Sequence, residues 1–198
     1  MHIAATAVGS NFAQADEGKR REHVQMTRDW IDHSVTLGAP CLRVFAGPVP
    51  EGHDEAQAFT WAVECLREVA AHGAERGVLL ALENHGGITT TAKQVLRLLA
   101  AVNSDWLGLN LDFGNFKHAD GMDPYQQFAA CAPAAVSTHA KVHMRDEQRN
   151  PVPVDYARVN QIMHAAGYRG YVSIEYEDQP EANLAVPKFV EYLKSTMT

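Results

Sequence analysis

Cysteine is scarce in this chain of 198 residues. Cys41, Cys65 and Cys131 are its three cysteines, and no two of them form a CxxC motif. An odd number of widely spaced cysteines supports neither a disulfide framework nor a zinc site built from thiolates. This cysteine usage fits a reducing compartment such as the cytoplasm.

Long apolar runs are also missing. No stretch approaches the roughly 18 apolar residues that cross a membrane. A short apolar run near the N-terminus leads to residues 13–15 (AQA), which resemble a signal-peptidase site. However, no Lys or Arg precedes that run and residues 10–12 (SNF) interrupt it, so a secretory signal is not indicated. We therefore expect a cytoplasmic protein with no membrane partner.

Positive charge is in short supply. The chain has 17 Lys and Arg against 24 Asp and Glu, a net charge of −7. A nucleic-acid backbone would be repelled over much of such a surface, so a small-molecule partner is favoured. The hydrophobic share of 46% and the charged share of 21% are ordinary for a globular protein with one core. We expect residues 1–198 to form a single domain.

Short β-rich runs alternate with amphipathic segments along the whole chain. Asp54, Asp123 and Asp155 precede three of the amphipathic segments and are predicted to cap helices. This alternation favours a parallel sheet with helices outside it. The predicted strands begin near His2, Cys41, Val78, Leu107, Ala140 and Tyr171.

Four potential metal ligands follow four of these runs: Glu83, Asp112, His143 and Glu175. They are separated by 29, 31 and 32 residues, each about the length of one strand-helix-strand unit. The carboxyl ends of parallel barrel strands meet at one mouth, so side chains this far apart in sequence can contact one ion. Three carboxylates would repel one another without a cation. Three carboxylates and one imidazole suit Mn²⁺ or Mg²⁺ best, with Co²⁺ or Zn²⁺ as further options.

Other interpretations of this region stay open. His143 could be a neutral core histidine, and His139 with His143 has the spacing of a helical zinc pair. The second alternative is weak because the Glu of an HExxH motif is missing and the surrounding residues favour a strand. Glu177 shares a strand face with Glu175 and could be the ligand instead. Lys141 would face the barrel together with His143, so its ammonium group needs a carboxylate partner.

Five segments of the chain have a distinctive sequence: residues 37–47 (LGAPCLRVFAG), 79–87 (LLALENHGG), 107–116 (LGLNLDFGNF), 141–146 (KVHMRD) and 167–177 (GYRGYVSIEYE). Together they resemble the sugar isomerase and epimerase branch of the xylose-isomerase-like TIM barrels. In that family a Glu, an Asp, a His and a Glu at four strand ends hold one divalent cation. The resemblance maps them onto Glu83, Asp112, His143 and Glu175.

The resemblance implies a metal-dependent isomerase or epimerase of a small sugar or keto-polyol. The reaction would remove a proton next to a carbonyl through an ene-diolate, with Glu83 and Glu175 as the acid/base pair. Three further residues are candidates for binding the substrate. His85 lies in the loop after Glu83, Asn115 stands where many ketose epimerases carry a His, and Arg149 follows His143 by six residues.

The resemblance also implies eight strands, whereas six are predicted here. We expect an α/β, xylose-isomerase-like TIM barrel that is N-terminally shortened to about six parallel βα units. Its two unpaired sheet edges predict a homodimer or another homo-oligomer. An inosose-type dehydratase and a non-catalytic sugar-binding barrel remain alternatives. A DNA-repair enzyme on the same barrel is disfavoured by the negative charge and the scattered histidines.

Overall fold

A curled sheet of six parallel strands forms the centre of the molecule. The computed structural model describes residues 2–178 and 181–197. The strands are β1 (Thr6–Ala7), β2 (Cys41–Val44), β3 (Leu79–Glu83), β4 (Leu107–Asp112), β5 (Ala135–Ala140) and β8 (Val172–Ile174). They lie in the order β1-β2-β3-β4-β5-β8, and each pairs in parallel with its neighbour. The predicted parallel sheet of six strands is confirmed.

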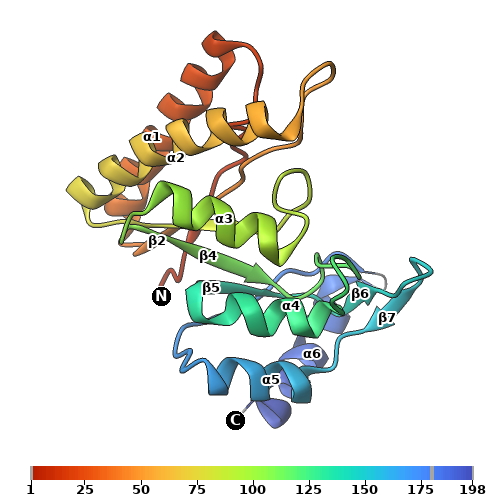
Figure 1. Cartoon of the computed structure of the whole chain (residues 1–198). Coiled ribbons are helices and arrows are strands. Elements are labelled where there is room, and N and C mark those ends of the chain that lie inside the picture. The colour runs from red at the N-terminus through yellow and green to blue at the C-terminus, as the bar shows by residue number, and fades with distance from the viewer. Residues whose placement is uncertain (1, 179–180, 198) are drawn as a thin grey trace.

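Helices follow the strands and cover the outside of the sheet (Figure 1). They are α1 (Glu17–Leu37), α2 (Glu55–Arg76), α3 (Ala92–Val102), α4 (Pro124–Cys131), α5 (Tyr156–Ala165) and α6 (Ala182–Thr196). Each helix packs beside the next one along the chain. All the carboxyl ends of the strands therefore open at one rim, as in a TIM barrel.

The aspartates predicted to cap helices do so. The carboxylates of Asp54, Asp123 and Asp155 accept backbone N–H hydrogen bonds at 2.8, 2.7 and 3.1 Å from residues three positions later. Such a cap stabilises a helix start by about 1 kcal/mol. These caps fix where α2, α4 and α5 begin.

An aromatic group packs behind the carboxyl end of β4. Phe113 lies edge-to-face against Phe128 and Tyr156, with ring centroids 5.5 and 6.1 Å apart. All three side chains are fully buried. The hydroxyl of Tyr156 donates a 2.7 Å hydrogen bond to the backbone oxygen of Lys141. This contact fixes the chain immediately after β5.

The fifth strand is not where the sequence predicted it. We expected a strand to begin near Ala140, but β5 ends there and begins at Ala135. The 3₁₀ turn η1 (Ala132–Ala134) runs directly into β5 and leaves no loop between them. The apolar alternation that suggested the later strand belongs to β6 (His143–Arg145), which pairs antiparallel with β7 (Pro151–Pro153). Met144 of β6 is buried, which explains the misleading pattern.

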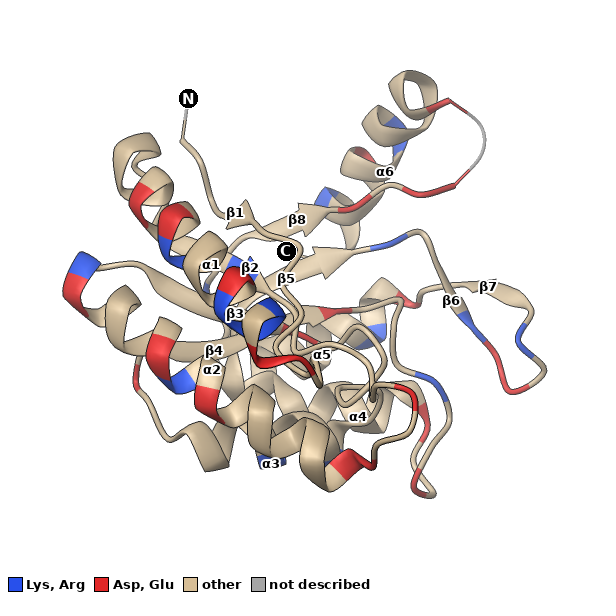
Figure 2. Ribbon diagram, turned by 90° about the horizontal axis from the view of Figure 1, so that it is seen from above, with Lys and Arg blue, Asp and Glu red and all other residues tan. Residues whose placement is uncertain are grey.

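The two edge strands approach each other without pairing. No ladder joins β1 to β8 within the described residues. Figure 2 shows the sheet curling so that these strands lie near each other. A cavity of about 140 Å³ lies at the amino ends of the strands, lined by residues that include Ala4, Cys41 and Tyr171. We call this gap, together with the exposed residue Tyr171 that lines it, the open seam. No helix in the described ranges is long and apolar enough to span a membrane.

The open seam predicts self-association. Tyr171 is 60% exposed, and unpaired edges favour contact with a second chain. Light scattering at low micromolar concentration should report twice the mass of one chain. Tyr171→Glu should shift the protein toward the monomer, whereas Val49→Glu, an exposed apolar position in the loop between β2 and α2, should not. A monomeric wild-type protein would contradict this expectation.

Candidate functional site

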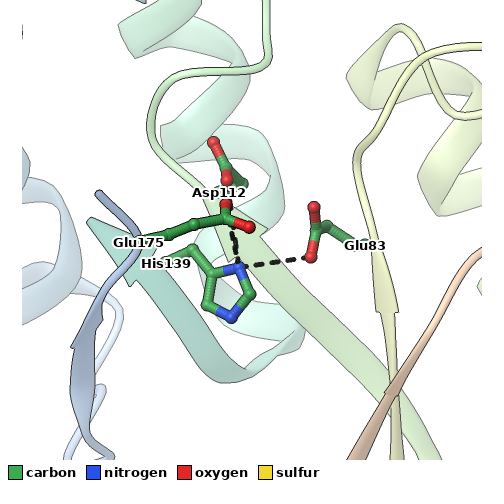
Figure 3. Close-up of side chains that lie close together, drawn as sticks. All are labelled: Glu83, Asp112, His139 and Glu175. Atoms are coloured by element: carbon green, nitrogen blue, oxygen red, sulfur yellow. Dashed lines mark ion pairs between the residues drawn. The ribbon is translucent and has the colours of Figure 1, made fainter. Parts of the chain in front are cut away.

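Three carboxylates and one imidazole meet at the carboxyl ends of four neighbouring strands (Figure 3). Glu83 ends β3, Asp112 ends β4, His139 is the penultimate residue of β5, and Glu175 follows β8 directly. One candidate ligand atom from each of these residues lies within 4.8 Å of the other three. We call these four residues the acid cluster.

The imidazole of His139 lies between the carboxylates. Its Nδ1 atom is 3.3 Å from Glu83 Oε2, 3.4 Å from Glu175 Oε2 and 3.9 Å from Asp112 Oδ2. Side chains at alternate strand positions point to the same side of a sheet. His139 is the last residue of β5 whose side chain points to the interior, because the strand ends at Ala140, which points to the other side.

Polar neighbours hold Asp112 in place. The Asn84 side chain donates to the Asp112 backbone oxygen at 3.0 Å and accepts from the Asp112 backbone N–H at 2.8 Å. Asp112 Oδ1 accepts a 2.7 Å hydrogen bond from the N–H of Gly114. These contacts fix one carboxylate oxygen and leave the other facing the cluster.

Glu83 is held from three sides. Its Oε2 atom accepts from the amide of Asn110 at 2.9 Å and lies 3.3 Å from Nε of Arg43. Its Oε1 atom accepts from the amide of Asn115 at 3.4 Å. The Glu83 side chain is only 1% exposed, so these partners stabilise an otherwise costly buried charge.

Burial and charge set the protonation of the cluster. Burial raises the pKa of Asp112 to about 8, and the nearby carboxylate of Glu83 adds to this rise. The imidazole of His139 holds the pKa of Glu175 well below its usual range. Burial disfavours a charged His139, but the carboxylates of Glu175 and Glu83 outweigh burial and raise its pKa to about 9. At neutral pH the cluster therefore binds protons that a cation could replace.

The donor atoms of the cluster fit a divalent cation. Asp112 Oδ2, Glu175 Oε2 and His139 Nδ1 are buried, and within the described residues they make ion pairs with one another and with Lys141 but no well-aligned hydrogen bond. Buried polar atoms are rarely left without well-aligned hydrogen bonds, and these three face one another. Three oxygen donors and one imidazole match the preferences of Mn²⁺ and Mg²⁺.

The imidazole in the acid cluster is that of His139, not that of His143. Three of the residues predicted as ligands, Glu83, Asp112 and Glu175, come together, but His143 lies beyond the end of β5. Its Nδ1 atom is 2.9 Å from Asp178 Oδ1. The physical reason is the position of β5, which ends before His143 and sends it into the β6–β7 hairpin. One signal in the sequence favours His139: it follows Asp112 by 27 residues, also about the length of one strand-helix-strand unit. The small and polar residues before it hide the strand that this interval implies.

A pocket of about 370 Å³ opens next to the cluster. Two of the three residues predicted to bind substrate, His85 and Asn115, line it, together with Lys141 and Arg145. The His85 ring also packs on Phe45 with centroids 4.4 Å apart. The third residue, Arg149, is not in the lining of this pocket. Arg149 is exposed at the end of the β6–β7 hairpin, where its backbone oxygen accepts a 3.3 Å hydrogen bond from Arg145.

The comparison with protein families agrees with this geometry. Residues 1–196 match the xylose isomerase-like TIM barrel family. The chain belongs to this family. No curated protein matches its sequence.

Solved structures of this xylose isomerase-like fold are similar to the chain along most of its length. One is a xylose isomerase-like TIM barrel protein from Mycobacterium smegmatis in complex with magnesium, with 19% identity, a TM-score of 0.77 and coverage of 98% of this chain and 74% of that one. A second is 3-keto-D-glucoside 4-epimerase from E. coli, with 14% identity, a TM-score of 0.79 and coverage of 96% and 78%. A third is D-psicose 3-epimerase from Clostridium cellulolyticum H10 with D-tagatose, with 16% identity, a TM-score of 0.76 and coverage of 96% and 77%.

Several residues support the site in roles that sequence reasoning did not assign to them. Asn84 holds the backbone of Asp112, Asn110 donates to the carboxylate of Glu83, Arg43 lies beside Glu83, and Asp178 holds His143. Asn110 and Arg43 could have been found, because each is a polar residue inside a strand whose neighbours are apolar. Asp178 gave no such indication, since it lies in a run of acidic residues.

The geometry predicts which histidine a metal ion would need. His139→Ala should weaken Mn²⁺ binding by at least about 100-fold, because it removes an inward-facing donor. His143→Ala is the matched control and should bind Mn²⁺ as the wild type does. Isothermal titration calorimetry measures both variants, and circular dichroism verifies that they are folded. Loss of binding in His143→Ala alone would contradict the assignment.

The protonation of the cluster predicts a pH dependence. With pKa values of about 8 for Asp112 and about 9 for His139, both groups hold protons at neutral pH that a cation must displace. Mn²⁺ affinity should therefore rise from pH 6 to pH 9. Calorimetry at pH 7 in buffers of different ionisation enthalpy should show proton release. Binding that is independent of the buffer would contradict this protonation.

Proposed function

We propose that the chain is a divalent-metal-dependent isomerase or epimerase of a small sugar or keto-polyol. The observation that carries this proposal is the acid cluster beside a polar pocket of about 370 Å³. The family membership supports it, and so do the sugar epimerases among the structures of similar fold. Mn²⁺ or Mg²⁺ is the proposed ion.

Glu83, Asp112, His139 and Glu175 would hold the ion. When bound, a divalent cation supplies Lewis-acid stabilisation of negative charge that develops on an oxygen. The chain's own contribution is the fixed placement of the four donors at adjacent strand ends. Two of the carboxylates, Glu83 and Asp112, are fully buried, which keeps competing water away from them.

Glu175 and Glu83 are the proposed acid/base pair. They lie at the ends of β8 and β3, and both contact His139 Nδ1. We expect one carboxylate to reach each face of the substrate carbon. Glu175 is the more accessible of the two, with 30% of its side chain exposed against 1% for Glu83. Its low pKa keeps it deprotonated at neutral pH, which is the state a base requires.

The proposed reaction begins when a carboxylate takes the proton from the carbon next to a carbonyl. The electron pair of the C–H bond forms a C=C bond, and the carbonyl π pair moves to oxygen to give an ene-diolate. Return of the proton to the opposite face gives an epimer, and return to the neighbouring carbon gives an isomer. A dehydratase would share the first step and then expel a β-hydroxyl, so the products decide between these outcomes.

The decisive experiment follows hydrogen exchange in D₂O. The protein should incorporate deuterium at the α-carbon of a ketose such as D-tagatose or D-psicose when Mn²⁺ is present, as seen by NMR. Removing the ion with EDTA should stop the exchange. Glu175→Gln should lower its rate by at least about 100-fold, since it removes a positioned proton acceptor.

Glu64→Gln, on the exposed surface of α2, provides the control and should retain the wild-type rate. Loss of water from the substrate would favour the dehydratase. A metal-loaded, folded protein that binds these ketoses without any exchange would favour the non-catalytic sugar-binding barrel.

A further inference from the structure

Lys141 lies at the boundary between the acid cluster and the pocket. Its Nζ atom is 3.2 Å from Glu175 Oε2 and 3.5 Å from Asp112 Oδ2 on the cluster side. It is 2.9 Å from Glu177 Oε2 and 3.3 Å from Asn115 Oδ1 on the pocket side. The same side chain also lines the pocket. One ammonium group therefore contacts both the proposed metal ligands and the space proposed for the substrate.

The surrounding chain fixes this lysine. Its side chain is only 10% exposed, and the Tyr156 hydroxyl holds its backbone oxygen. The aliphatic stem passes Gly114 so closely that a Cβ there would come within 2.7 Å of Lys141 Cδ and 3.1 Å of Lys141 Cβ. A buried lysine loses rotamer freedom and hydration, so it needs compensating contacts. Lys141 is thus a built part of the site and not a surface cation that folds over it.

The ammonium group has three N–H donors for four oxygen neighbours. A divalent cation held by Asp112 and Glu175 would compete for two of these oxygens and would repel the ammonium. Glu177 and Asn115 would then remain as its partners. With two partners for three N–H donors, one N–H is left over for a ligand that enters the pocket, which Lys141 lines.

We propose that Lys141 is a catalytic residue that donates a hydrogen bond to the substrate oxygen on which charge develops. This inference rests on the proposed function. When the α-proton moves to a carboxylate and the carbonyl π pair moves to oxygen, the N–H of Lys141 stabilises that oxygen. The lysine keeps its proton throughout, so the atoms and electrons of the step balance without a further reactant. Binding of the cation and binding of the substrate oxygen are coupled, because the first frees the donor for the second.

A neutral variant of the same length provides the test. Lys141→Met keeps the stem beside Gly114 and removes the charge. Removing one oxyanion donor lowers a rate by about 100-fold or more, and this is the loss expected in the D₂O exchange. The affinity for Mn²⁺ should stay the same or rise, since a repelling cation is gone. Lys93→Met, exposed on α3, makes the same change in net charge and should alter neither quantity.

A second measurement does not depend on turnover. Acetohydroxamate resembles a planar ene-diolate and can be titrated into the Mn²⁺-loaded protein. Loss of a hydrogen bond from a charged donor should weaken its binding by about tenfold in Lys141→Met, with no change in Lys93→Met. Wild-type protein without Mn²⁺ should bind the probe more weakly than the loaded protein.

The possible outcomes separate the two proposals. Weaker acetohydroxamate binding in Lys141→Met supports the role of the lysine even if no ketose exchanges its proton, in which case the proposed function fails alone. Unchanged probe binding overturns the role of Lys141, whatever the exchange assay shows. Loss of Mn²⁺ binding in the folded variant also overturns it, because Lys141 would then serve only to hold the cluster together.

Discussion

The mutual repulsion of three carboxylates, two of them fully buried, is the constraint on which the site depends. Glu83, Asp112 and Glu175 come within contact of one imidazole at the rim of the sheet. Two cations from the chain, Lys141 and Arg43, lie against them and offset part of this charge. An interior that holds more negative than positive charge is costly unless protons or a metal ion complete the balance. Burial, and after it the negative charge of Glu83, raises the pKa of Asp112, and the same excess of negative charge makes the cluster suitable for a divalent cation.

The fold brings these charges together because the strands are parallel and adjacent. Each ligand comes from the carboxyl end of a strand, and β3, β4, β5 and β8 are consecutive in the sheet. Helix caps after the rim loops and the aromatic packing behind β4 keep these ends in register. In the folded sheet, residues that are about thirty positions apart in sequence are therefore neighbours. Burial of the hydrophobic core stabilises this arrangement.

Much of the fold could be predicted from the sequence, and the reason is physical. Apolar β-rich runs such as those of β3 and β4 are buried on both faces, so their composition alone indicates parallel strands. The capping aspartates were equally clear, because a side chain that caps a helix acts locally. The strand β5 was placed wrongly because its sequence, AVSTHA, carries small and polar side chains and its pairing depends on neighbouring strands. The shift moved the imidazole of the cluster from His143 to His139, while Glu83, Asp112 and Glu175 occupy the predicted strand ends. Contacts such as His143 with Asp178 depend on loop conformation, which no periodicity in the sequence encodes.

Asn84 makes one part of the acid cluster more rigid than the other. Its two hydrogen bonds to the backbone of Asp112 continue the pairing of β3 with β4 beyond the last ladder residues, so Glu83 and Asp112 are tied to one unit. Glu175 is tied to the sheet by one backbone hydrogen bond of 3.0 Å, from its N–H to the oxygen of Ala140, and its side chain is the most exposed of the three carboxylates. Changes in the geometry of the cluster therefore fall on the β8 side, where a carboxylate can move without disturbing the central strands.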